Sequence, residues 1–134
     1  MAQTLHKSLP LILAREFAAN IATAVSVWDE RGRLVYFNEP AERIVGRPHS
    51  EVGELEPAEW TRLFAVERLD GTPVLLEEMP VGIAHLEKHP AHDTLTFTDL
   101  GGSRHEVEVT AFPLLGRADE LLGVVAVYWE PPNK

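Results

Sequence analysis

The residues best suited to chemistry are two histidines, His85 and His89, which stand four positions apart. In a helix this spacing brings two imidazoles to one side, where they can bind a single metal ion. The zinc-protease signature has glutamate directly after its first histidine, whereas here Glu87 follows two positions later. A catalytic zinc is therefore not expected. We interpret both histidines as solvated or capping side chains, because positive charge near a helix C-terminus complements the helix dipole.

Other catalytic patterns find little support in the sequence. The chain has no cysteine, none of its serines lies in a G-x-S-x-G elbow, and no glycine-rich loop precedes a helix. Carboxylates are plentiful, so a small α+β enzyme that works by acid–base chemistry, such as an isomerase or dehydratase, is kept as an alternative. Those enzymes usually begin with more than one helix, whereas here a hairpin is expected directly after a single helix. The sequence favours a protein that is not an enzyme.

Composition limits the partners. The 134 residues carry a net charge of -9, which repels nucleic acid and anionic lipid surfaces. The longest apolar run, 121–129, is less than half of the roughly 20 residues that a membrane span needs. The absence of cysteine fits a reducing compartment. We expect a single cytoplasmic domain with neither nucleic acid nor a membrane as its partner.

Residues 1–21 are predicted to form an amphipathic helix. Leu9, Leu13 and Phe17 recur at every fourth position, which places them on one side of that helix. An apolar stripe of this kind packs either on the chain's own sheet or on a second subunit, and the pattern does not decide between them. These three residues are the candidate dimer contacts, and the helix is the candidate dimerisation or coupling element.

The rest of the chain predicts one antiparallel sheet. Segments 24–29 and 33–37 are rich in β-branched and aromatic residues and are joined by a short turn, which is typical of a hairpin. Asn38 then fits the N-cap of a short helix. The other expected elements are a helix at 78–88 and strands at 92–99, 104–114 and 120–130. The predicted fold class is α+β, with a five-stranded antiparallel sheet, short helices across one face and the N-terminal helix in front.

Residues 22–130 closely resemble a PAS sensor domain, and residues 131–134 form a tail. The resemblance depends on an ordered set of segments rather than on one diagnostic motif. These segments are DERGR, LVYFNEPAERIVG, DGTPV and EEMPVGIAHL, followed by three strands. It implies a module whose sheet and helices enclose a pocket for a small ligand, with occupancy passed to a partner, and it gives Asn38 the position of the family's usual asparagine.

The resemblance also implies function and cofactors. It points to a sensory module in signal transduction, of the two-component type, that forms a homodimer and binds a small ligand or a signalling protein. The cofactor is left unknown. A haem-based gas or redox sensor with His85 as the iron ligand is one alternative, because haem-binding relatives use a histidine on the equivalent helix. The flavin–cysteine photochemistry of the blue-light branch is excluded, because the chain has no cysteine.

The candidate pocket residues come from the hairpin, the second helix and the last strands. Alternation on strands and helical spacing also allow each of them a purely structural role, in the core or toward water. The candidates are Tyr36, Asn38, Ile83, His85, Leu86, Thr96 and Tyr128. Pro131 and Pro132 disfavour a helix that continues from the last strand, so the N-terminal helix is the expected route for a signal.

Overall fold

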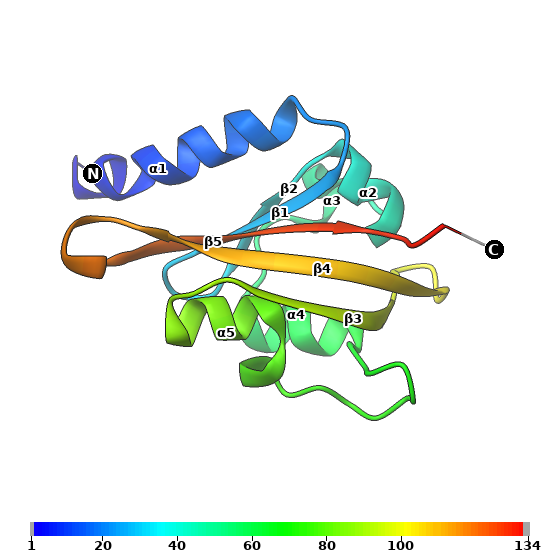
Figure 1. Cartoon of the computed structure of the whole chain (residues 1–134). Coiled ribbons are helices and arrows are strands. Elements are labelled where there is room, and N and C mark those ends of the chain that lie inside the picture. Colours follow the sequence, from blue (N-terminus) through cyan, green and yellow to red (C-terminus); the bar gives the residue numbers. More distant parts are fainter. Residues whose placement is uncertain (1, 133–134) are drawn as a thin grey trace.

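The computed structural model describes residues 2–132, and the side chains of residues 9–132 (Figure 1). The helices are α1 (Ala2–Ala19), α2 (Glu39–Val45), α3 (His49–Val52), α4 (Pro57–Phe64) and α5 (Pro80–Glu87), with short 3₁₀ turns at Leu76–Glu78 and Arg117–Asp119. The strands are β1 (Ala24–Asp29), β2 (Leu34–Phe37), β3 (Ala91–Thr98), β4 (Arg104–Leu115) and β5 (Leu121–Trp129). Within the described residues, no helix is both long enough and apolar enough to cross a bilayer.

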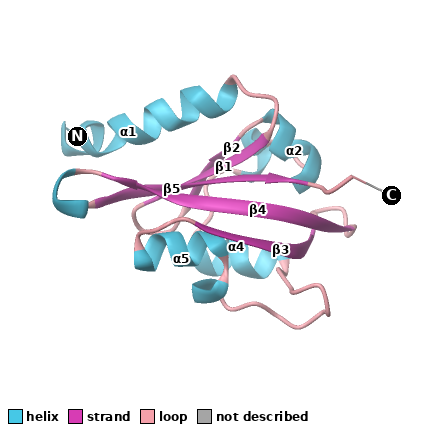
Figure 2. Ribbon diagram, in the orientation of Figure 1, coloured by secondary structure: helices cyan, strands magenta, loops and turns pink. Residues whose placement is uncertain are grey.

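The five strands form one antiparallel sheet in the order β2-β1-β5-β4-β3. Figure 2 shows α1 over one face of the sheet, with α4 and α5 over the other. We call the face toward α4 and α5 the inner face and the face toward α1 the outer face. The predicted α+β fold with a five-stranded antiparallel sheet is confirmed.

The β1–β2 turn is fixed by its aspartate. Asp29 Oδ1 accepts hydrogen bonds from the backbone nitrogens of Arg31 and Arg33, at 2.9 and 3.0 Å. Gly32 has a φ of 83°, a left-handed conformation that favours glycine over other residues. Asn38 caps α2 as predicted, since its Oδ1 accepts from the backbone nitrogen of Ala41. Local chemistry therefore accounts for the turn and for the start of α2.

Helix α1 has two apolar sides. Leu11, Ala14 and Ala18 pack on the outer face of the sheet, in a cluster that includes Val25 and Val27 of β1. The guanidinium of Arg15 lies 4.9 Å from the centre of the Tyr36 ring, which adds a cation–π contact to β2.

The stripe predicted from the sequence lies on the other side of α1. Leu9, Leu13 and Phe17 are 57%, 60% and 60% exposed. The sequence left open whether this stripe packs on the chain's own sheet or on a second subunit. In the structure these three residues do not pack on the sheet.

Candidate functional site

An apolar cavity of about 110 Å³ lies between the inner face of the sheet and the helices. Its walls come from β1, α2, α4, α5 and the last three strands, which meet over the main core. The lining residues are Trp28, Val45, Trp60, Phe64, Val66, Met79, Pro80, Val81, Leu95, Thr96, Phe97, Val107, Val109, Ala126 and Tyr128. A hollow of this size inside a close-packed core suits a small ligand.

Two tryptophans shape one wall of the cavity. Trp28 comes from β1 and Trp60 from α4, and their rings meet edge to face with centroids 5.7 Å apart. Trp60 Nε1 donates to the carbonyl oxygen of Gly32 at 3.0 Å. Trp28 Nε1 is buried and has no hydrogen-bond partner. The two indoles therefore differ: one is held by the backbone, and the other has a free donor.

The two hydroxyls in the lining are already paired. Tyr128 OH lies 2.7 Å from Ser26 Oγ, and burial of the side chain outweighs this hydrogen bond and raises the pKa of Tyr128 to about 12. Thr96 Oγ1 donates to the carbonyl oxygen of Glu67 at 3.3 Å and accepts from Arg104 Nη2 at 2.9 Å. These hydroxyls serve the framework of the cavity.

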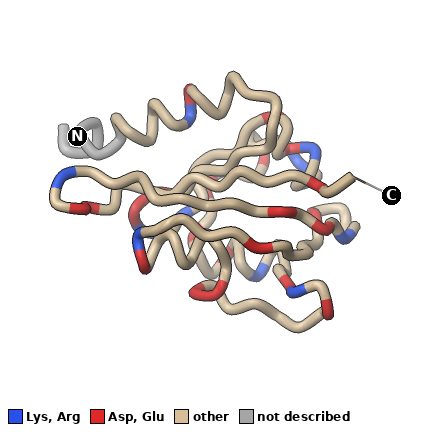
Figure 3. Tube along the Cα trace, in the orientation of Figure 1, with Lys and Arg blue, Asp and Glu red and all other residues tan. Residues whose placement is uncertain are grey.

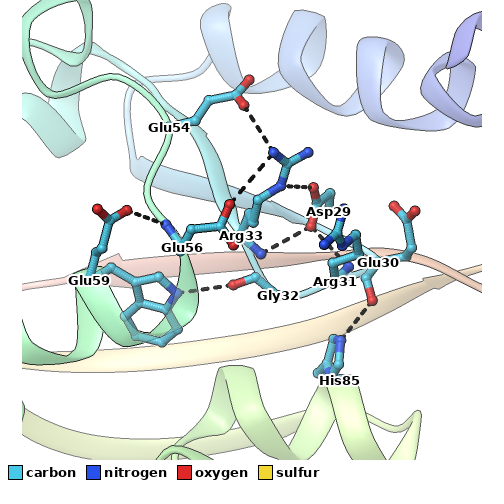
Figure 4. Close-up of polar contacts among 10 residues, drawn as sticks. Asp29, Glu30, Arg31, Gly32, Arg33, Glu54, Glu56, Glu59 and His85 are labelled. Atoms are coloured by element: carbon cyan, nitrogen blue, oxygen red, sulfur yellow. Dashed lines mark hydrogen bonds and ion pairs between the residues drawn. The ribbon is translucent and has the colours of Figure 1, made fainter.

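The β1–β2 turn contacts two of the helices that line the cavity, and Figure 4 shows these polar contacts. The turn meets α4 through the bond from Trp60 to Gly32, and it meets α5 through His85, whose Nε2 lies 2.8 Å from the carbonyl oxygen of Glu30. A carbonyl only accepts, so His85 Nε2 carries the proton. Arg33 adds an ion pair to Asp29 at 2.8 Å. Both helices of the cavity wall are thereby tied to one turn.

A charged cluster borders the cavity at the far end of the sheet. His105 Nε2 lies 2.7 Å from Asp99 Oδ2, and its Nδ1 lies 2.7 Å from Glu130 Oε2. Partial burial opposes a charge on this imidazole, but the two carboxylates outweigh it and raise the pKa of His105. The ring stacks on Phe97, which lines the cavity, with centroids 5.3 Å apart. The cluster joins the end of β5 to the β3–β4 turn.

The sequence and the fold of the chain are similar to those of known proteins. Residues 14–55 match the sequence model of the PAS fold. The structure is similar to the crystal structure of the Rhodobacter sphaeroides LOV protein, with a TM-score of 0.71 and 15% sequence identity over 90% of this chain. The chain has the PAS fold. The resemblance predicted from the sequence is confirmed.

Two further structures have a similar fold. One is the PAS domain of nitrogen regulation protein NR(II) from Vibrio parahaemolyticus, with a TM-score of 0.62, 16% identity and coverage of 89% of this chain and 98% of that one. The other is the light-state dimer of the fungal blue-light photoreceptor Vivid, with a TM-score of 0.63, 14% identity and coverage of 83% of this chain and 79% of that one. The chain spans 66% of the Rhodobacter protein, less than two thirds of its length. No curated protein sequence matches the chain significantly.

These relatives correct the exclusion of flavin photochemistry. LOV and blue-light receptors share the fold of this chain, so excluding flavin photochemistry from the sequence was wrong. Without a cysteine the chain cannot form a covalent bond to a flavin. The missing cysteine does not decide whether the fold can bind a flavin without that bond. A fused three-ring flavin is larger than a cavity of about 110 Å³, so holding one requires the cavity to widen.

The haem alternative does not fit the structure. His85 is absent from the lining, and its Nε2 is engaged by the backbone of Glu30 in the β1–β2 turn. His89 points elsewhere, with its Nε2 3.0 Å from Glu87 Oε1. Among the described residues, no group of three or more His, Cys, Asp and Glu side chains could hold a metal ion. His85 therefore binds the β1–β2 turn, whereas His89 contacts only its neighbours Glu87 and Pro90, and the two imidazoles have no partner in common.

Two of the seven candidate pocket residues line the cavity and five lie outside it. The structure brings Thr96 and Tyr128 to the cavity. Leu86 is 61% exposed and Ile83 is outside the lining, because α5 turns Pro80, Val81 and Ala84 inward instead. The candidates that lie outside the cavity are Tyr36, Asn38, Ile83, His85 and Leu86.

Two of these candidates have structural roles away from the cavity. Tyr36 packs in the outer cluster, beneath Arg15 of α1. Asn38 is fully buried, where it bonds the backbone of three elements.

Sequence reasoning missed the two tryptophans that dominate the cavity. Alternation along β1 could have identified Trp28, because it shares a strand face with Ser26, whose hydroxyl pairs with Tyr128. Trp60 lies on α4. Its hydrogen bond to Gly32 spans 28 positions and has no local signature.

Proposed function

We propose that this PAS domain is a sensory signalling module that binds a small, largely apolar ligand in its cavity and passes occupancy to a partner through α1. The observation that carries the proposal is the position of β1 between the two cores. Trp28 of β1 lines the cavity, while Val25 and Val27 of the same strand pack with α1 on the opposite face. A ligand that favours one position of β1 thereby favours one position of α1.

The lining supports binding rather than catalysis. Within the described residues, Tyr128 is the titratable side chain that borders the cavity, and a pKa of about 12 leaves it protonated at neutral pH. General acid–base catalysis requires a group that titrates near the working pH. An isomerase or dehydratase therefore finds no acid–base pair in this cavity.

The partner that we propose for α1 is a second copy of the chain. Leu9, Leu13 and Phe17 form an exposed apolar stripe, and Figure 3 shows few charged positions along the described part of α1. Two chains with a net charge of -9 repel each other, so a weakly charged helix face is the favourable place for them to meet. An apolar stripe on a surface helix marks a contact with another chain.

The setting that we propose is cytoplasmic signalling of the two-component type. The PAS domain of a nitrogen regulation protein has this fold, which supports a regulatory role. An RNA-binding light–oxygen–voltage receptor also has it, so fold alone does not select the partner. The acidic charge supports a protein partner over nucleic acid.

Ligand binding in the cavity can be followed through Met79, which lines it and is one of two methionines in the chain. We expect the methyl signal of Met79 in a ¹³C-methyl-methionine NMR spectrum to shift and saturate when methylenecyclopentane, a small hydrocarbon, is added. Ala126→Leu fills the cavity from β5 and should weaken this probe at least tenfold, a change of about 1.4 kcal/mol or more.

The matched control is Ala58→Leu, which adds the same atoms to an exposed position of α4 and should leave the titration unchanged. A wild-type Met79 signal that does not respond, or that responds equally in Ala126→Leu, contradicts a ligand-binding cavity.

The dimer is tested by Phe17→Glu, which places a charge in the middle of the exposed stripe. We expect the wild-type chain to sediment as a dimer. In the variant the dissociation constant of the dimer should rise about tenfold or more, because a buried unpaired carboxylate opposes association. Leu69→Glu changes an equally apolar and exposed residue away from α1 and should keep the dimer. A monomeric wild type, or a dimer that Phe17→Glu leaves intact, rules out this interface.

A further inference from the structure

His105 of β4 lies between two carboxylates, one from the β3–β4 turn and one from the residue that follows β5. Its Nε2 is 2.7 Å from Asp99 Oδ2, and its Nδ1 is 2.7 Å from Glu130 Oε2. An ionised carboxylate only accepts hydrogen bonds, and a neutral imidazole has a single N–H. Both contacts are therefore hydrogen bonds only when the imidazole is charged and both of its nitrogens donate.

The imidazole is shielded from water and from other charges. The His105 side chain is 17% exposed, and its ring stacks on Phe97 of β3. Of its two neighbours on β4, Arg104 forms an ion pair with Glu67 at 3.2 Å, and Glu106 is exposed and alternates to the other face of the strand. Within the described part of the chain, the two carboxylates are the charged groups that act on this imidazole.

The two carboxylates favour the charged form of the imidazole. Partial burial lowers the pKa of His105, but the carboxylates raise it by more, so that the pKa lies above its ordinary value of 6.5. Both hydrogen bonds are therefore complete below pH 6.5, and one of them is lost as the pH rises through the raised pKa. The change falls in the range above pH 6.5.

Glu130 is the partner that a neutral imidazole loses. Asp99 is 13% exposed, and its Oδ1 accepts from the backbone nitrogens of Gly101 and Ser103, each at 2.9 Å, which hold it in the turn. Glu130 is 50% exposed, and among the described residues its carboxylate has no other hydrogen bond or ion pair. When Nε2 keeps its proton for Asp99, Nδ1 presents a lone pair to the Glu130 carboxylate and repels it.

We propose that His105 is a pH-dependent switch at the end of β5: the charged imidazole holds Glu130 against the β3–β4 turn, and the neutral imidazole releases it. Glu130 directly follows the last residue of β5, so its release loosens the backbone at the point where the chain leaves the sheet. The switch needs no ligand in the cavity, and it gives the module a second input, the proton concentration.

The titration of His105 and the motion of Glu130 test this switch together in the wild-type chain. The imidazole C–H signals in a ¹H–¹³C NMR spectrum are assigned by single replacements of the histidines. His105 should titrate with a midpoint above 6.5. The backbone amide signal of Glu130 should shift with the same midpoint, and its ¹H–¹⁵N heteronuclear NOE should fall as the pH rises, because the residue becomes more mobile.

Two variants and a matched control assign the effect to this pair. Glu130→Gln keeps the length of the side chain and removes its charge, so the midpoint of His105 should fall toward 6.5. His105→Gln should abolish the shift that follows the His105 midpoint at the Glu130 amide. In the control, Glu108→Gln removes a carboxylate that lies 2.8 Å from His92, and it should leave the midpoint of His105 unchanged.

Three results would overturn the proposal. The first is a wild-type His105 midpoint at or below 6.5. The second is a midpoint that Glu130→Gln lowers no more than Glu108→Gln does. The third is a heteronuclear NOE of Glu130 that stays constant while His105 titrates, because Glu130 would then remain in place without the hydrogen bond. The first and third results come from the wild-type chain and do not depend on the folding of a variant.

Discussion

Replacing Asn38 with alanine should lower the free energy of unfolding by about 4 kcal/mol or more, a large part of the total stability of a domain of this size. The side chain is 1% exposed. Its Oδ1 accepts from the backbone nitrogens of Val25 and Ala41, and its Nδ2 donates to the carbonyl oxygens of Ala18 and Thr23. Alanine leaves these four backbone groups without the partner they have now, at about 1–3 kcal/mol for each that stays buried.

Urea denaturation of the wild type, Asn38→Ala and a control measures this effect. The control is Asn20→Ala, which removes a single exposed bond to the carbonyl oxygen of Glu16 and should cost less than about 1 kcal/mol. Asn38→Asp should also be strongly destabilising, because a carboxylate would face the two carbonyl oxygens that the amide now serves. A loss in Asn38→Ala no larger than the control would show that the four bonds are replaceable.

Asn38 also shows how far the sequence could predict the fold. The cap of α2 was predictable, because it needs only an asparagine three positions before the nitrogen it accepts from. The bond to Ala18 was not, because that carbonyl lies 20 positions away at the end of α1. The same side chain caps α2 and bonds the distant end of α1, and only the cap has a pattern in the sequence.

The strands and turns were predictable for the same reason as the cap. The β-branched and aromatic residues of β1, the alternation along β4, and the aspartate and glycine of the β1–β2 turn are signals that act over a few residues. Helix α1 was only half predictable, since it has apolar residues on two sides. Periodicity finds both sides, but the choice of which one meets the sheet depends on the shape of the outer cluster.

The cavity was the hardest part to predict, because α5 is apolar almost all round. Such a helix offers several faces that could turn inward, and a stripe containing Ile83 and Leu86 is as regular as the face that is actually buried. The structure turns Val81 and Ala84 inward because the helix begins directly after the 3₁₀ turn Leu76–Glu78 and packs closely against it. The sequence signal of that close packing is Gly82.

Gly82→Ala should lower the free energy of unfolding by about 3 kcal/mol or more. A Cβ atom at this position would overlap the carbonyl oxygen of Leu76 and lie 2.7 Å from its carbonyl carbon. These are backbone atoms, which cannot rotate away as a side chain can, so α5 and the 3₁₀ turn must separate. Alanine is the better helix former by about 1 kcal/mol, so a net loss measures the close contact and not helix propensity.

Thermal or urea denaturation of Gly82→Ala tests this, with Gly101→Ala as the control. In the control the new Cβ would meet only Asp99 Oδ1, at 3.4 Å, and a change within about 1 kcal/mol is expected. Because α5 supplies Pro80 and Val81 to the cavity wall, Gly82→Ala should also weaken the binding of methylenecyclopentane reported by Met79. A variant as stable as the wild type, with unchanged probe binding, would mean that α5 can move away from the turn at no cost, and that the cavity wall is not held by this contact.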